Sequence, residues 1–320
     1  MPVAEPDIVG RLQRREPSGF LLASVRGVGQ VDLQPLLWTG VLILAALWSA
    51  GWRIGLFATL GTLISTATAY ALGADRSNIA LGLQGYCGCL TGIALVTYLG
   101  HHPATYVLAV VGAIVCTLLT ATLTTFLSPY GLTALTAPFC LVSGVMVLGA
   151  PSFGRIWHGA PKAVSDPTSG DTGISWSDLW HAFFTNVSQI FLVDEWYVGL
   201  IMLAGLALAG VRVFLYAAAG SVMGIVAAWA LGAPTAQIAQ GIYGYNAVLV
   251  AIALGAVFLT GTVANGVYAL FGAAATTGLT ASLTSLFKPF GGHTFTWPFI
   301  LTTWALMAAV PLLPRLRRSA

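Results

Sequence analysis

Charged residues are scarce in this chain of 320 residues. They make up only 7% of it, against roughly a quarter of an ordinary soluble domain, while hydrophobic residues make up 57%. So few charges exclude a chain whose surface faces water along most of its length. The composition predicts an integral membrane protein.

The few cations gather near the two ends of the chain, and the formal net charge is +3. We interpret this excess of cations as a signal for membrane orientation rather than for nucleic-acid binding. By the positive-inside rule, both termini are expected on the cytoplasmic side of a plasma (cell inner) membrane. An even number of crossings follows. Residues 1–34 lack the apolar core and cleavage site of a secretory signal, so we expect no cleaved leader. Seven of the 13 Lys and Arg residues lie near the two ends: Arg11, Arg14, Arg15 and Arg26 at one end and Arg315, Arg317 and Arg318 at the other.

Cysteine is also rare, and its spacing fits neither a zinc site nor a disulfide framework. Cys87 and Cys89 form a CGC triplet, and Cys116 and Cys140 lie inside apolar runs, so we expect buried free thiols. The chain has no HExxH or GxSxG motif and no acidic cluster in its apolar runs, which argues against a membrane enzyme. We predict no metal or cofactor.

Ionisable residues are almost absent from the apolar runs themselves. Asp194, Glu195, Arg53, Arg212 and Lys288 lie at their ends, and the neighbouring pair His101–His102 falls in a connection, where a solvated pair is more plausible than a metal or proton site. Because a carrier coupled to an ion generally needs such a group within the membrane, the sequence favours a neutral, polar solute.

Ten apolar runs divide into two sets of five. The first set covers about residues 35–51, 54–73, 79–99, 104–127 and 133–150, and the second covers about 194–210, 212–231, 237–259, 264–287 and 294–313. Runs of about twenty residues suit helices that cross a bilayer. An odd number in each set makes the second set enter from the opposite side, as in the inverted repeats of transporters.

The domain organisation follows from these runs. We expect a cytoplasmic segment at 1–34, a first repeat at 35–150, an extracellular or periplasmic connection at 151–186, a second repeat at 187–313 and a basic tail at 314–320. The connection is rich in Pro, Gly, Ser and Asp, and its end, from Trp176 to Phe184, suits a short interfacial helix.

The two halves are also copies in sequence. An offset of 159 aligns Gln30 with Gln189 and Tyr86 with Tyr245, and an offset of 160 aligns Thr136 with Thr296. Glycines interrupt the third run of each half: Gly82, Gly85 and Gly88 in the first, Gly241 and Gly244 in the second. They suit a re-entrant half-helix, with close helix packing through small residues as the alternative. The sequence therefore predicts an all-α membrane protein with ten transmembrane helices and two re-entrant half-helices in two inverted repeats.

Three motifs that occur twice, in order, make the chain resemble the urea transporter family. They are GQVDLQ and SQIFLV at 29–34 and 188–193, GLQGYCGCL and GIYGYNAVL at 82–90 and 241–249, and PYGLTALTAPF and PFGGHTFTWPF at 129–139 and 289–299. The resemblance, over about residues 27–312, implies a passive, channel-like path for urea in each protomer of a homotrimer.

The resemblance also implies roles for individual residues. Gln30 and Gln189 would accept hydrogen bonds from urea, and Thr136 and Thr296 would line the narrow middle of the path. The flat apolar walls would be formed by Tyr86, Leu90, Tyr245 and Leu249. A slot with apolar faces and oxygen-lined edges suits a planar molecule with four N–H donors.

This sequence departs from the family pattern in three places. Gln34–Pro35 and Asp194–Glu195 stand where an Asn-Pro pair is usual, so the second opening is acidic and would attract cations mildly. In the first copy Cys87 stands at the position that Asn246 holds in the second, and Leu33 and Leu192 stand where an aromatic residue is common.

The alternatives to a urea channel are a channel for another small neutral solute, such as a short amide or ammonia, and, less favoured, a coupled secondary transporter.

Overall fold

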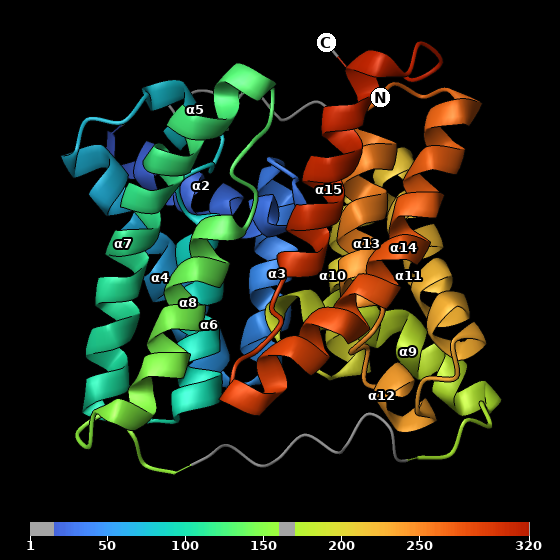
Figure 1. Ribbon diagram of the computed structural model, residues 1–320. Helices are drawn as coiled ribbons and strands as arrows, with labels where there is room; N and C mark the ends of the chain where they lie inside the picture. The colour runs from blue at the N-terminus through green and yellow to red at the C-terminus, as the bar shows by residue number, and fades with distance from the viewer. Residues whose placement is uncertain (1–15, 160–169, 320) are drawn as a thin grey trace. The chain divides into compact units, whose positions relative to one another are not determined.

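The computed structural model describes residues 16–159 and 170–319, with side chains from residue 19 on. This part of the chain is helical, apart from turns, connections and an isolated bridge between Leu259 and Arg318 (Figure 1). It forms two compact units, the first from 16–128, 133–159 and 208–210, and the second from 129–132, 170–207 and 211–319. Each unit holds one copy of the sequence repeat almost entirely.

The first unit contains seven α-helices in the described range. They are α2 (Glu16–Gly29), α3 (Leu37–Ala50), α4 (Trp52–Ala71), α5 (Arg76–Ala80), α6 (Tyr86–Leu99), α7 (Pro103–Leu127) and α8 (Ala137–Gly149), with short 3-10 turns η1 (Gln30–Asp32), η2 (Ser128–Tyr130) and η3 (Ala150–Ser152).

The second unit repeats this order. Its helices are α9 (Trp176–Ser188), α10 (Trp196–Ala209), α11 (Val211–Ala230), α12 (Thr235–Ala239), α13 (Tyr245–Ile252), α14 (Val263–Phe287) and α15 (Trp297–Ala309), with 3-10 turns η4 (Gln189–Phe191), η6 (Lys288–Phe290) and η7 (Val310–Leu312). A π-helical stretch, η5 (Ala253–Phe258), extends α13. Helices α4 and α11 both have 20 residues, and α7 and α14 both have 25, so the repeat read from sequence is also a repeat of structure.

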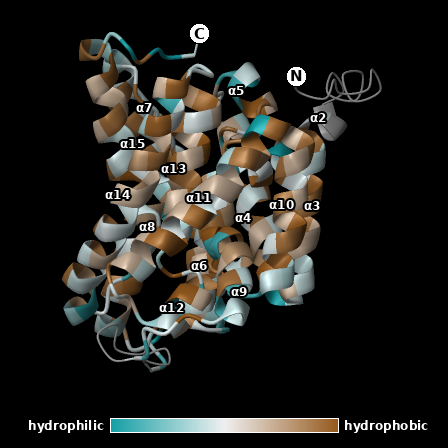
Figure 2. Ribbon diagram, turned by 90° about the vertical axis from the view of Figure 1, so that its right-hand side faces the viewer, coloured by the Kyte–Doolittle hydropathy of each residue, from teal (hydrophilic) through white to brown (hydrophobic). Residues whose placement is uncertain are grey.

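The longest helices have the length and composition of membrane spans. Four of the described helices pass this test: α4, α7 with η2, α11 and α14 with η6. The count rises to six if each of two bent helix pairs is one span, and four shorter apolar helices include α6, α8, α13 and α15. Apolar residues predominate along these helices (Figure 2), and many remain exposed, among them Val263 and Val267. Such exposed apolar helices fit lipid better than water.

A sharp bend separates the first two helices of each unit. The pairs α2–α3 and α9–α10 bend by 79° and 78°. The bend follows a leucine in the left-handed region, Leu33 (φ 62) in one copy and Leu192 (φ 60) in the other. This conformation is uncommon for a residue other than glycine. The sharpest breaks therefore fall at the glutamine motifs, a position that we did not predict from the sequence.

Two helices occupy residues that we expected to lie outside the apolar runs. Helix α2 lies in the predicted N-terminal segment, yet Ala23 and Val28 are buried and the helix packs against α3 and α4. Helix α9 confirms a helix at Trp176–Phe184. Its first turn is a capping box in which Ser175 and Asp178 bond each other's backbone N–H groups.

The glycine motif serves both as a turn and as a packing surface. Gly82 (φ 81) and Gly241 (φ 76) adopt the left-handed region in the connections before α6 and α13. Gly61 and Gly88 let α4 and α6 approach so closely that a Cβ on Gly61 would lie 2.1 Å from the Gly88 carbonyl oxygen. Small-residue packing, the alternative reading of these glycines, therefore applies to Gly88. Helix α6 begins at Tyr86 rather than near residue 79 because these turns precede it.

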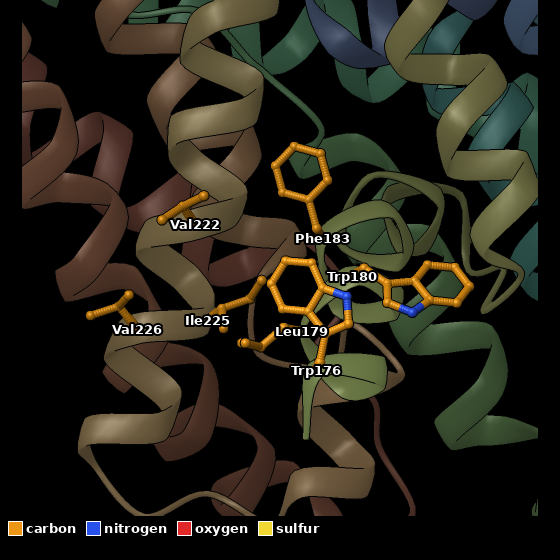
Figure 3. A pocket seen from close by; sticks show the side chains of 7 residues that line it. All are labelled: Trp176, Leu179, Trp180, Phe183, Val222, Ile225 and Val226. Carbon is orange, nitrogen blue, oxygen red and sulfur yellow. The ribbon is translucent and has the colours of Figure 1, made fainter. Parts of the chain in front are cut away.

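An apolar groove lies between α9 and α11 in the second unit (Figure 3). Its volume is about 370 Å³. Aromatic side chains of α9 and aliphatic side chains of α11 line it: Trp176, Leu179, Trp180, Phe183, Val222, Ile225 and Val226. It holds none of the predicted site residues.

Candidate solute-binding site

Gln30 lies in η1, at the bend between α2 and α3, and only 7% of it is exposed. Its side-chain Nε2 donates a hydrogen bond of 2.8 Å to the backbone carbonyl of Leu81. A carbonyl can only accept, so this bond assigns the NH₂ group to that side of the amide. The amide oxygen takes no part in this bond, and it can only accept.

The same turn carries Gln189 in the second unit. Gln189 begins η4 and is partly buried, and its backbone carbonyl accepts the N–H of Leu192 at 3.0 Å, as the carbonyl of Gln30 accepts the N–H of Leu33 at 3.0 Å. The two glutamines therefore occupy equal backbone positions in their own units.

A tyrosine at the start of α6 or α13 anchors the next motif. The hydroxyl of Tyr86 donates to the backbone carbonyl of Leu135 at 2.7 Å, and the hydroxyl of Tyr245 donates to that of Phe295. Leu135 (φ 50) and Phe295 (φ 44) are both in the left-handed region, which costs about 1 to 3 kcal/mol for such a residue. The tyrosine bond offsets part of that cost, because it satisfies the carbonyl of the left-handed residue.

A threonine follows each strained residue. Thr136 and Thr296 are the N-cap residues of α8 and α15 and are 2% and 1% exposed. Their backbone carbonyls accept the N–H groups of Cys140 and Ile300, both at 3.1 Å. Leu90 and Leu249, on α6 and α13, are fully buried. Each threonine therefore lies at the start of a helix, directly after the residue in the left-handed region.

Helix α6 is the common neighbour of the predicted residues in the first unit. It carries Tyr86 and Leu90 and packs against η1, which carries Gln30, and against α8, which Thr136 caps. Helix α13 is the equivalent neighbour in the second unit, in contact with η4 and α15. Each unit thus brings its own four predicted residues into one group of elements.

Asn246 and Cys87 hold the same backbone region differently. The side chain of Asn246 accepts the N–H of Phe299 at 3.2 Å and donates to the hydroxyl of Thr280 at 3.3 Å. In the first unit the Cys87 thiol lies 3.7 Å from the Leu135 carbonyl oxygen and also bonds the backbone of Phe139. The thiol therefore replaces the amide, as the departure from the family pattern suggested, and all four cysteines are buried free thiols.

None of the eight predicted residues carries a charge. Within 16–159 and 170–319 no three His, Cys, Asp or Glu side chains gather as a metal site. Asp194 and Glu195 are exposed beside η4. His101, in the connection between α6 and α7, is exposed, and its pKa is lowered by partial desolvation and by the nearby Arg53 and His102. In each unit the predicted residues carry amide, phenol and hydroxyl oxygens close to a buried leucine, and such neutral groups suit a small neutral solute with several N–H donors.

Sequence reasoning missed the backbone groups that position these side chains. No single residue type in the sequence indicates them. They are the carbonyls of Leu81 and Leu135 and the left-handed backbone at four leucine and phenylalanine positions. Only their recurrence at matched repeat positions reveals them. Arg26 and Thr185 are a further matched pair: each binds the carbonyl that ends α5 or α12, Ala80 at 3.0 Å and Ala239 at 2.6 Å.

Comparisons with known proteins bear directly on the solute. A family model described as "Urea transporter" matches residues 21–311. Sheep Urea transporter 1 is 32% identical over 288 residues, which are 87% of this chain and 74% of the sheep protein. Rat Urea transporter 1 is 30% identical with the same coverage, and the mouse protein is 29% identical over 92% of this chain and 78% of its own length.

Proposed function

Because this chain belongs to the urea transporter family and transports urea, we propose that urea passes through it passively, along a narrow slot lined by both repeats. The chain is a multi-pass membrane protein and a transporter rather than an enzyme. The observation that carries the proposal is the matched placement of uncharged oxygen donors and acceptors in the two units.

The residues fit the chemistry of urea. Gln30 and Gln189 accept hydrogen bonds from urea N–H groups at two wider sites, and the bond from Gln30 to Leu81 supports this assignment because it leaves the amide oxygen for the solute. Thr136 and Thr296 line the narrow middle. Tyr86 with Leu90 and Tyr245 with Leu249 provide flat apolar walls that exclude hydrated ions.

The proposal includes a topology and a location. Four long helices, two bent pairs and four shorter apolar helices together would give ten crossings in two inverted repeats. Both termini would then lie on the cytoplasmic side of the plasma membrane, in line with the cations near the ends of the chain. As the family resemblance implies, the protein would be a homotrimer with one path in each protomer.

Passive permeation is preferred over coupled transport because of the side chains available. A coupling ion needs an ionisable group within the membrane, and the eight proposed residues are all neutral. Another small neutral solute, such as acetamide or ammonia, is the second candidate. Uptake of urea, acetamide and methylamine measured side by side separates these solutes, and accumulation of urea against its gradient would contradict passive transport.

Stopped-flow light scattering of proteoliposomes after a jump in external urea tests the proposal. The double variant Thr136→Val, Thr296→Val keeps the side-chain volume but removes two hydroxyls. Each lost hydrogen bond is worth about 0.5 to 1.5 kcal/mol, so we expect urea flux to fall about tenfold.

The matched control is Thr122→Val, because this threonine is exposed on α7 and donates only to the Leu118 carbonyl one turn back, at 3.0 Å. It should keep the flux of the original protein. Unchanged flux in the double variant would remove both threonines from the path, and flux of the unaltered protein equal to that of empty liposomes would refute urea permeation.

A further inference from the structure

A carboxylic acid is buried two residues after Gln30. Asp32, in η1, has 0% of its surface exposed, and neither of its carboxyl oxygens has a hydrogen-bond partner among the residues that the structure describes. Its backbone carbonyl accepts the side-chain Nε2 of Gln34 at 3.2 Å, so the amide that follows stabilises the turn but not the carboxyl group. Asp32 is not among the residues to which the proposed function gives a role.

The equivalent position in the second unit is apolar. Phe191 stands there, in η4, and is also 0% exposed. The backbone of the two turns is the same, since each is closed by a leucine in the left-handed region, Leu33 and Leu192. Because the second copy accommodates a phenyl ring at this position, we infer that the matched position of Asp32 is also apolar. In such surroundings the burial of a neutral carboxylic acid costs far less free energy than the burial of a carboxylate.

Few groups could balance a negative charge at Asp32. Helices α2 and α6 pack against η1. The titratable or charged side chains of the described part of these helices are Arg26 on α2 and Tyr86, Cys87, Cys89 and Tyr98 on α6, and the described α3 has none. The Arg26 guanidinium donates to the Ala80 carbonyl. Cys89 interacts electrostatically with Asp32, but its thiol is bonded to Thr62 and would add a second negative charge if it ionised.

We propose that Asp32 is a protonated positioning residue that makes urea permeation depend on pH. The neutral acid packs in the apolar position and keeps the turn that holds the Gln30 amide. Loss of its proton in alkaline solution creates an unpaired buried charge, which is relieved when the turn moves towards solvent. Gln30 then loses its place beside Leu81, and urea flux falls. This inference rests on the proposed function of Gln30.

The flux experiment compares three proteins in liposomes at about pH 6 and about pH 9.5, a range over which a group that titrates near its middle changes its protonated fraction more than tenfold. The original protein should lose at least about fivefold in urea flux at the higher pH. Asp32→Asn cannot ionise and should keep its flux at both values. Asp194→Asn, which removes an exposed acid beside η4, should show the same fall as the original protein.

A second variant and a second measurement keep the inference testable if Asp32→Asn does not fold. Asp32→Phe copies the residue of the other turn and should also give flux independent of pH. Infrared spectroscopy at neutral pH should show the carbonyl band of a protonated carboxylic acid that is absent from either variant.

A flat pH profile in the original protein, or an equal fall in Asp32→Asn and Asp32→Phe, would overturn the inference. So would a spectrum in which Asp32 contributes a carboxylate band at neutral pH. Absence of urea flux at every pH would instead refute the proposed function, and the infrared spectrum would still decide whether Asp32 carries a proton.

Discussion

The close approach of the Gly82 turn to helix α2 should determine the position of the Leu81 carbonyl that binds Gln30. Gly82 precedes α6 with φ 81, and a Cβ at this position would lie 2.4 Å from the backbone nitrogen of Gly27 and 2.5 Å from the carbonyl carbon of Arg26. The adjacent residue, Leu81, supplies the carbonyl that orients Gln30. Gly82→Ala therefore tests whether this contact positions the site.

The size of the effect follows from these distances. Ordinary contact of a Cβ begins at 3.4 Å, so the turn must move by about 1 Å relative to α2. A shift of this size is enough to take the 2.8 Å bond between Gln30 and Leu81 outside hydrogen-bond range. The left-handed conformation adds about 1 to 2 kcal/mol for alanine, and the overlap adds about 1 to 3 kcal/mol.

Gly73→Ala is the matched control. Gly73 has φ 73, nearly the same conformation, but nothing lies within 4 Å of its added Cβ. It should share the conformational cost, and therefore a small loss of thermal stability, without moving Leu81. The second unit offers the same comparison between Gly241→Ala, whose Cβ would lie 2.7 Å from the Thr185 carbonyl carbon, and Gly232→Ala, which has open space.

Urea flux into proteoliposomes and melting temperature in detergent are the two measurements. We expect Gly82→Ala to lower flux about tenfold, in line with the loss of a hydrogen bond and the displacement of its partner, and Gly73→Ala to leave flux unchanged. Equal flux in Gly82→Ala and the original protein, with the protein shown to be folded, would refute the argument that the turn positions Gln30. Equal losses in both variants would show that conformational strain, and not contact with α2, is responsible.

Two further predictions concern stability. Tyr86→Phe leaves the carbonyl of the left-handed residue Leu135 without its 2.7 Å donor, so the apparent melting temperature should fall by a few degrees, as expected for about 1 to 3 kcal/mol; Tyr106→Phe on the surface of α7 should not lower it, and equal shifts would contradict this role. The Ser77 hydroxyl and the Asn78 N–H lower the pKa of Asp75, the exposed N-cap of α5, below its usual 3.8. The cap therefore stabilises the protein above about pH 4 and is lost as the pH falls through the lowered pKa. Melting curves from about pH 6 to about pH 3 should show a small loss that Asp75→Asn lacks, and identical pH profiles would contradict it.

Much of the architecture could be predicted because it depends on composition and on the repeat. The expected runs 54–73, 104–127, 212–231 and 264–287 match α4, α7, α11 and α14 within about three residues. Long apolar stretches must form helices in lipid, since every backbone polar group there needs an internal partner. The same rule does not say where a helix begins after a turn, so α8 and α15 start at 137 and 297 rather than at 133 and 294.

Helix α2 shows the opposite case. The sequence indicated a polar segment of mixed charge there, and it gave no sign that Arg26 would be only 5% exposed and bound to the Ala80 carbonyl. A charged side chain can be buried when it donates to a backbone acceptor, and this acceptor comes from α5, about fifty residues away in the chain. No local pattern records such a partner.

The sequence by itself determined the class of protein and the two copies, and it predicted the eight site residues, because hydrophobicity, repeat spacing and paired motifs are properties of the chain in order. Only the tertiary structure decided how those residues are held. The Leu81 carbonyl turns the Gln30 amide, the carbonyls of Leu135 and Phe295 hold the two tyrosines, and the bends of 79° and 78° fall at the glutamines. These are contacts between backbone groups and distant side chains, and backbone groups are the same in every residue, so their partners are set by packing.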